Sequence, residues 1–143
     1  MESSILNIIQ DMQNPETFAA GKTVFVEGEP GYTMYVVLEG HVEICVGGKT
    51  LEVAGPGSVI GEMALINLSK RSATAIAQDD CTLASIDDLQ FLFLIVRRPQ
   101  FALSVMEIMA NRLRHMDTIL QSGNHLAPPK HLDSCLHHRE PTA

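Results

Sequence analysis

The stretch VIGEMALINLSKRSAT, residues 59–74, combines residue types that together suit a sugar phosphate. Gly61 and Glu62 precede a run of small and apolar residues, and Arg71 follows nine positions after the carboxylate. Glycine lets a backbone approach a ligand closely, and a short helix over 62–66 would present free N–H groups to an anion. Arg71 would donate to phosphate oxygens, whereas an ionised Glu62 would accept hydrogen bonds from sugar hydroxyls.

Each part of this pattern also has an ordinary explanation. A Gly-Glu pair commonly marks a turn followed by a helix start, and a lone arginine is commonly a solvated surface charge. The spacing of all the parts in one short stretch favours the binding interpretation.

The same stretch resembles the phosphate-binding cassette of cyclic nucleotide-binding domains, as in the catabolite activator protein, kinase regulatory subunits and cyclic nucleotide-gated channels. That cassette has an aromatic or aliphatic residue, then Gly-Glu-(Leu/Met)-Ala-Leu, variable residues, and Arg-(Ser/Ala/Thr)-Ala. The matching residues here are Ile60, Gly61, Glu62, Met63, Ala64, Leu65, Arg71, Ser72 and Ala73. The resemblance covers about residues 15–116 and is closest to a stand-alone, bacterial-like domain. It implies a β-roll (jelly roll, or double-stranded β-helix) with a short cassette helix and a C-terminal lid helix.

The resemblance also implies roles for individual residues. Arg71 and cassette amides would neutralise a cyclic phosphate, and Glu62 would accept from the ribose 2'-hydroxyl. Val59 and Ile60 would wall the sugar and base. In related channel domains an arginine about forty positions beyond the phosphate arginine caps the base, and Arg112 fits that spacing. The expected ligand-binding residues are Val59, Ile60, Gly61, Glu62, Met63, Ala64, Arg71, Ser72, Ala73 and Arg112.

Residues 99–121 predict the long helix that carries Arg112, with a proline at a permitted early position. One face of it presents, at steps of three or four, Phe101, Val105, Ile108, Arg112, Met116 and Ile119. Two interpretations of Arg112 stay open. In the first, the methylene groups of Arg112 pack at the edge of this apolar face and its guanidinium lies in water. In the second, the guanidinium faces a purine base.

The expected ligand is cAMP in preference to cGMP, with no further cofactor. In related domains a threonine directly after the cassette arginine accompanies guanine selectivity. Ser72 occupies that position here, and its hydroxyl reaches less far.

Short β-rich segments surround the cassette and predict a mainly β fold with flanking helices, such as a sandwich, jelly roll or barrel. The expected strands are 23–27, 34–38, 41–46, 49–54, 72–77 and 82–86. Gly47-Gly48 predicts a two-residue hairpin, and 88–96 predicts a short helix.

We expect three segments along the chain. Residues 1–14 form an N-terminal helical segment, 15–121 form the cyclic nucleotide-binding domain with its C-terminal helix, and 122–143 form a flexible tail. The tail is too short and irregular for a helix-turn-helix. No metal site is expected, because the cysteines lack CxxC spacing and no ligand spacing relates the tail histidines, His125, His131, His137 and His138.

Composition narrows the function further. A chain of 143 residues fits one domain, and a net charge of -7 argues against a nonspecific grip on nucleic acid or an anionic membrane. The start lacks a basic signal-like region and no stretch approaches about 18 apolar residues, so we expect a cytoplasmic protein. No nucleophile, base and oxyanion donors occur as a set, so we expect no enzyme.

These expectations combine into a regulatory sensor, in which a cyclic nucleotide moves the C-terminal helix. The sequence leaves open what responds to this movement: a protein effector in trans, a second copy pairing through 99–121, or further parts of a larger protein. The rival readings are a ligand-free interaction module of the same fold, and the sensory part of a transcription regulator or channel.

Overall fold

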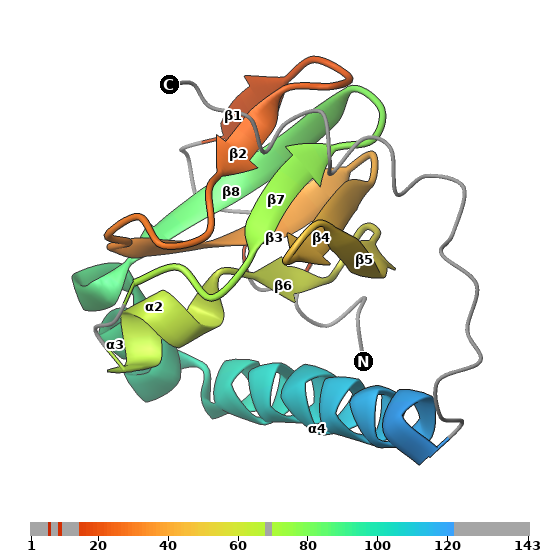
Figure 1. The fold of residues 1–143 in the computed structure, drawn as a ribbon. Helices are drawn as coiled ribbons and strands as arrows, with labels where there is room; N and C mark the ends of the chain where they lie inside the picture. Colours follow the sequence, from red (N-terminus) through yellow and green to blue (C-terminus); the bar gives the residue numbers. More distant parts are fainter. Residues whose placement is uncertain (1–5, 7–8, 10–14, 68–69, 122–143) are drawn as a thin grey trace.

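The computed structural model describes residues 6, 9, 15–67 and 70–121, which form two antiparallel four-stranded sheets with helices packed on one side (Figure 1). The strand orders are β1-β8-β3-β6 and β2-β7-β4-β5. The strands are β1 (Pro15–Phe18), β2 (Thr23–Phe25), β3 (Thr33–Glu39), β4 (Val42–Val46), β5 (Lys49–Ala54), β6 (Val59–Ile60), β7 (Thr74–Ala77) and β8 (Cys81–Asp87). The helices that the structure describes in full are α2 (Glu62–Asn67), α3 (Asp88–Arg97) and α4 (Pro99–Gln121). The predicted mainly β fold with flanking helices is confirmed.

Each strand expected from the sequence is present within a few residues of its predicted bounds, but two strands were not expected. The edge strand β1 begins at a proline and, among the described strands, pairs with β8 alone, and β6 is two residues long, so neither shows a readable alternation. The hairpin between β4 and β5 turns at Gly47 and Gly48, whose φ values of 59° and 83° suit this tight turn.

The two larger clusters of buried side chains in the described residues hold the elements together. The first fills the space between the two sheets and contains Phe25, Val37, Val42, Ala54, Ile60, Ala75, Ala77, Cys81 and Leu83. The second lies between one sheet and the helices and contains Ile9, Met34, Val36, Val59, Leu65, Ala84, Ile86, Leu94, Phe101 and Val105. Neighbours in a strand point to opposite faces, so Val36 and Val37 belong to different clusters. The helices are therefore fixed to the outer face of the β1-β8-β3-β6 sheet.

The two helices that follow the sheet start differently. Asp87 caps α3, because its carboxylate accepts from the backbone of Gln90 at 2.8 Å while the Gln90 side chain accepts from the backbone of Asp87 at 2.9 Å. In α4 the predicted apolar face is seen at Phe101 and Val105, which are buried. No described helix is long and apolar enough to cross a bilayer.

Some expectations lie outside the described residues. These are the flexible tail with its four histidines, most of the N-terminal helical segment, and the side chains of Met116 and Ile119. Leu6 and Ile9 are helical, and Ile9 packs in the second cluster.

Candidate functional site

A cavity of about 370 Å³ lies between the cassette, strands β4 and β5, and helix α4. The cassette half is lined by Ile60, Gly61, Glu62, Met63, Ala64, Arg71, Ser72 and Ala73, with Phe25 beside them. The other half is lined by Ile44, Val46, Leu51, Glu52, Met109, Arg112, Leu113 and His115. All the predicted site residues except Val59 therefore line one cavity. Its volume falls in the range of small-molecule sites, roughly 300–1,000 Å³.

Arg71 is a buried cation held by backbone and ring contacts rather than by a carboxylate. Its Nη1 donates to the carbonyls of Thr33 at 2.7 Å and Gly61 at 3.2 Å, and its Nη2 donates to the Thr33 hydroxyl at 3.3 Å. Its guanidinium carbon lies 4.2 Å from the centroid of the Phe25 ring. Burial lowers the pKa of Arg71, against the opposing effects of Tyr35 and Glu29, yet a guanidinium stays charged.

Two glycines make room for this guanidinium. A Cβ on Gly31 would lie 2.7 Å from the guanidinium carbon of Arg71, and one on Gly61 would lie 2.6 Å from Nη1. Gly61 also has a φ of 76°, which other residues rarely adopt. The small residue at 61 thus serves the arginine itself, in addition to any approach of a ligand.

The turn between β2 and β3 holds the segment that carries Arg71. The backbone N–H of Gly28 donates to the Arg71 carbonyl at 2.9 Å, and the N–H of Arg71 donates to the Glu29 carbonyl at 2.7 Å. Pro30 and Lys70 form a bridge next to these bonds. Backbone pairing therefore fixes the position of Arg71 from a turn some forty residues earlier.

Glu62, the first residue of α2, presents a buried carboxylate to the cavity. Its Oε2 accepts from Nη1 of Arg112 at 2.9 Å. Its Oε1 is buried and has no hydrogen-bond partner among the described residues. A buried carboxylate oxygen without a donor is costly, so this atom marks a place where a ligand hydroxyl would be stabilised.

Arg112 links α4 to three other elements. Its Nε donates to Oε1 of Glu52 on β5 at 2.9 Å, its Nη1 donates to Glu62, and its Nη2 donates to the carbonyl of Val59. Burial would lower the pKa of Arg112, but the carboxylates of Glu62 and Glu52 outweigh this effect and raise it. The interpretation with the head of Arg112 in water is wrong, because the guanidinium is paired on every nitrogen.

Sequence reasoning misplaced one site residue and missed others. The side chain of Val59 packs in the helix-side core instead of the cavity, although its carbonyl accepts from Arg112. Phe25, Thr33 and Glu52 were not predicted as site residues. Each comes from a distant strand, and no local motif marks it.

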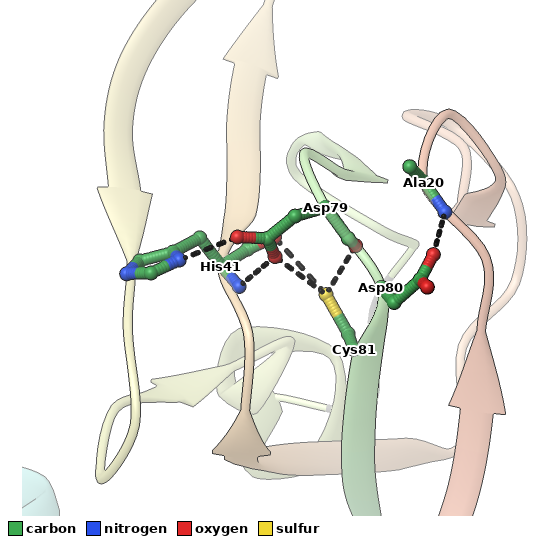
Figure 2. Close-up of polar contacts among 5 residues, drawn as sticks. All are labelled: Ala20, His41, Asp79, Asp80 and Cys81. Carbon is green, nitrogen blue, oxygen red and sulfur yellow. Dashed lines mark hydrogen bonds and ion pairs between the residues drawn. The ribbon is translucent and has the colours of Figure 1, made fainter.

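A second polar cluster lies where β4 begins and β7 ends, since these two strand ends are paired, and it includes Cys81 at the start of β8 (Figure 2). The backbone N–H of His41 and its Nδ1 lie 2.7 Å and 2.9 Å from the two carboxylate oxygens of Asp79, and Asp80 accepts from the backbone of Ala20. The thiol of Cys81 donates to the carbonyls of His41 and Asp79 at 3.0 Å and 3.1 Å. Burial, reinforced by Asp79, raises the pKa of this thiol, so the cluster ties loops together and does not activate a nucleophile.

Within the described ranges, no group of three or more His, Cys, Asp or Glu side chains is placed to hold a metal ion.

Several known proteins are similar to this chain in sequence. Among curated proteins, the chain is 36% identical over 105 residues to a cyclic AMP receptor protein of Thermus thermophilus, covering 70% of this chain and 49% of the relative. It is 32% identical over 90 residues to a cAMP-dependent protein kinase regulatory subunit of Yarrowia lipolytica, covering 63% of this chain and 24% of the relative. The chain thus spans about half the length, or less, of these relatives.

Solved structures agree with the sequence relatives. The catabolite activator protein of Thermus thermophilus superimposes with a TM-score of 0.67 at 29% identity, covering 80% of this chain and 61% of that chain. The N-terminal domain of a transcriptional regulator from Streptomyces coelicolor has a TM-score of 0.54 at 31% identity, covering 75% and 78%. The family model for the cyclic nucleotide-binding domain matches residues 15–98, from β1 through the cassette to the end of α3. The chain therefore belongs to the cyclic nucleotide-binding domain family.

Proposed function

We propose that this domain binds 3',5'-cyclic AMP in the cavity, in preference to cyclic GMP, and signals its occupancy through α4 without catalysing a reaction. One observation carries the proposal. A buried carboxylate oxygen of Glu62, which has no donor in the part of the chain that the structure describes, and the buried guanidinium of Arg71 line the same cavity. A ribose linked to a cyclic phosphate carries a hydroxyl for the first and an anion for the second.

The phosphate end of the ligand would be held by Arg71. Three of its N–H groups are held by Thr33 and Gly61, and the N–H on Nε and one on Nη2 have no acceptor among the described residues. These two groups are adjacent on one edge of the guanidinium, a geometry that matches two phosphate oxygens. A protein with a net charge of -7 needs such a placed cation to bind an anion.

Support for cAMP comes from two sources. Ser72, in place of a threonine, follows the cassette arginine and lines the cavity. Two of the relatives carry names that refer to cAMP, namely the receptor protein and the kinase regulatory subunit.

Signalling through α4 is supported by the contacts of Arg112. The helix supplies part of the cavity wall. Its Arg112 forms an ion pair of 2.9 Å with Glu62, the carboxylate proposed to bind the ribose. A nucleotide that completes the hydrogen bonding of Glu62 would stabilise the arrangement in which α4 lies against the cassette. The partner that responds to α4 is proposed to be a protein effector in trans or a second copy that pairs through α4. That the protein acts in the cytoplasm stays a prediction.

Calorimetric titration tests this function, with 5'-AMP as the control ligand because it lacks the cyclic phosphodiester. Saturable binding of cAMP, weaker binding of cGMP and still weaker binding of 5'-AMP are expected. Hydrogen exchange of α4 amides should slow when cAMP is bound. Absence of heat and of any thermal shift with millimolar cAMP and cGMP would overturn the proposal and favour an interaction module that binds no nucleotide.

A further inference from the structure

The half of the cavity away from the cassette has an apolar wall with a carboxylate set into it. Its apolar side chains come from β4, β5 and α4 and are Ile44, Val46, Leu51, Met109 and Leu113. If the sugar and phosphate lie at the cassette, a purine base occupies this half. Flat apolar contacts hold any purine, so selection among bases depends on the polar groups in this wall.

Glu52 on β5 is the carboxylate in this wall. Its Oε1 accepts from Nε of Arg112 at 2.9 Å, and its Oε2 has no hydrogen-bond partner among the described residues. The side chain is 26% exposed, so it is partly withdrawn from water. An ionised carboxylate only accepts hydrogen bonds, and the free oxygen therefore favours a ligand group that donates.

The two common purines differ in what they offer such an oxygen. Adenine carries an amino group at its 6-position, which donates, whereas guanine carries an oxo group there, which accepts. Guanine also carries two donors, N1–H and its 2-amino group, but its 6-oxo oxygen would face the carboxylate if the base lay with its 6-position toward Glu52. Arg112 donates to Oε1 of Glu52, so Oε2 is the oxygen of this carboxylate that has no donor among the described residues.

We infer that Glu52 is a specificity-determining residue that accepts a hydrogen bond from the 6-amino group of adenine and disfavours a 6-oxo purine. Arg112 is the positioning residue, since its bond to Oε1 leaves Oε2 as the remaining acceptor. The inference rests on the proposed function and adds the atom of the base that is recognised.

The test compares cAMP with cyclic IMP on the same protein by calorimetry. Cyclic IMP has a 6-oxo group in place of the 6-amino group and therefore carries a hydrogen on N1, where adenine has none. Cyclic GMP is measured as a third ligand. For the wild type we expect cAMP to bind about tenfold more tightly than cyclic IMP, the effect of one hydrogen bond to a charged group. Glu52→Gln should bring this ratio close to one, because the amide donates to an oxo group as readily as it accepts from an amino group. Glu52→Asp keeps the charge beside Arg112 but shortens the reach, and should also lower the ratio.

Glu107→Gln is the matched control, because Glu107 is exposed on α4, outside the cavity, and the substitution removes the same charge. It should leave the ratio unchanged. An equal ratio in wild type and Glu52→Gln, or tighter binding of cyclic IMP or cGMP than of cAMP by the wild type, would overturn the role of Glu52 while leaving nucleotide binding in place. Failure of all three nucleotides to bind the wild type would instead overturn the proposed function, and this inference with it.

Discussion

Nη1 of Arg112 on α4 lies 2.9 Å from Oε2 of Glu62, the residue that begins the cassette helix. The carboxylate proposed to bind the ribose hydroxyl therefore also holds the C-terminal helix. The other oxygen of Glu62 is left for a ligand. Lid and nucleotide thus share one side chain, and changes at this pair should affect both stability and binding.

Arg112→Ala should destabilise the protein, because it leaves the buried Glu62 and the half-buried Glu52 without their cation. We expect a loss of about 2 to 3 kcal/mol, somewhat below the cost for a fully buried pair because Arg112 is partly exposed. Urea denaturation measures the loss, and Arg98→Ala, which removes an exposed arginine outside the cavity, is the control. A double-mutant cycle with Glu62→Gln should show coupling of about 1 kcal/mol or more, and strictly additive losses would contradict the ion pair.

Arg71→Ala should weaken cAMP binding by about 2 to 3 kcal/mol, because a charge-assisted bond to the phosphate is lost. Arg71→Lys keeps the charge but loses the planar fork and the stacking on Phe25, so its affinity for cAMP should fall between those of the wild type and Arg71→Ala. Calorimetry at equal ionic strength gives the values, again with Arg98→Ala as the control. Wild-type affinity in Arg71→Ala would rule out the phosphate role.

Glu62→Gln should separate the ribose contact from the rest of the site. The substitution should weaken cAMP more than 2'-deoxy-cAMP, since only the former has the hydroxyl that Oε1 would accept from. Comparing the two ligands on each protein corrects for any loosening of α4. An equal loss for both ligands would mean that the carboxylate does not contact the 2'-hydroxyl.

Gly61→Ala should cost stability and displace Arg71. Both a positive φ and a Cβ placed 2.6 Å from Nη1 oppose the methyl group, so we expect a loss of about 2 kcal/mol or more and weaker cAMP binding. Gly21→Ala is the matched control, because Gly21 has a φ of 87° with no atom within 4 Å of the added Cβ. It should show the backbone strain alone. Equal losses in both variants would show that the guanidinium does not need the space at Gly61.

The contact between Asp79 and His41 predicts a pH effect on stability. Hydrogen bonds from the side chain and then the backbone of His41 hold the pKa of Asp79 below its usual range. A carboxylate of this kind contributes stability above its unfolded pKa of about 3.9, and the contribution is lost as the pH falls through the lower folded value. Asp79→Asn should therefore flatten the loss of stability below about pH 4, measured as the urea midpoint from pH 6 downward.

The control for this effect is the double variant His41→Ala, Asp79→Asn. Its acid limb should match that of Asp79→Asn alone, because the pair acts as one unit. An acid limb in Asp79→Asn as steep as in wild type would contradict the assignment.

Local chemistry explains what could be predicted from the sequence. Gly61, Glu62 and Arg71 lie close together in the chain, so their spacing alone indicates a short helix and an anion site, and the strands around them alternate in the usual way. The contacts between distant strands leave no such trace. Glu52 pairs with Arg112 across 60 residues of sequence, and the ring of Phe25 on β2 stacks against the guanidinium of Arg71. Val59 was misassigned because a two-residue strand does not reveal which face each side chain takes.

Helix α4 supplies part of the cavity wall, and this has a consequence for any protein that binds the helix. Linkage between two sites is reciprocal: if cAMP changes the affinity of α4 for a partner by some factor, the partner changes the affinity for cAMP by the same factor. The partner is then an effector of the nucleotide site as well as its reader. The affinity for cAMP measured on the domain alone describes one side of that thermodynamic cycle, and the affinity of the partner-bound domain describes the opposite side.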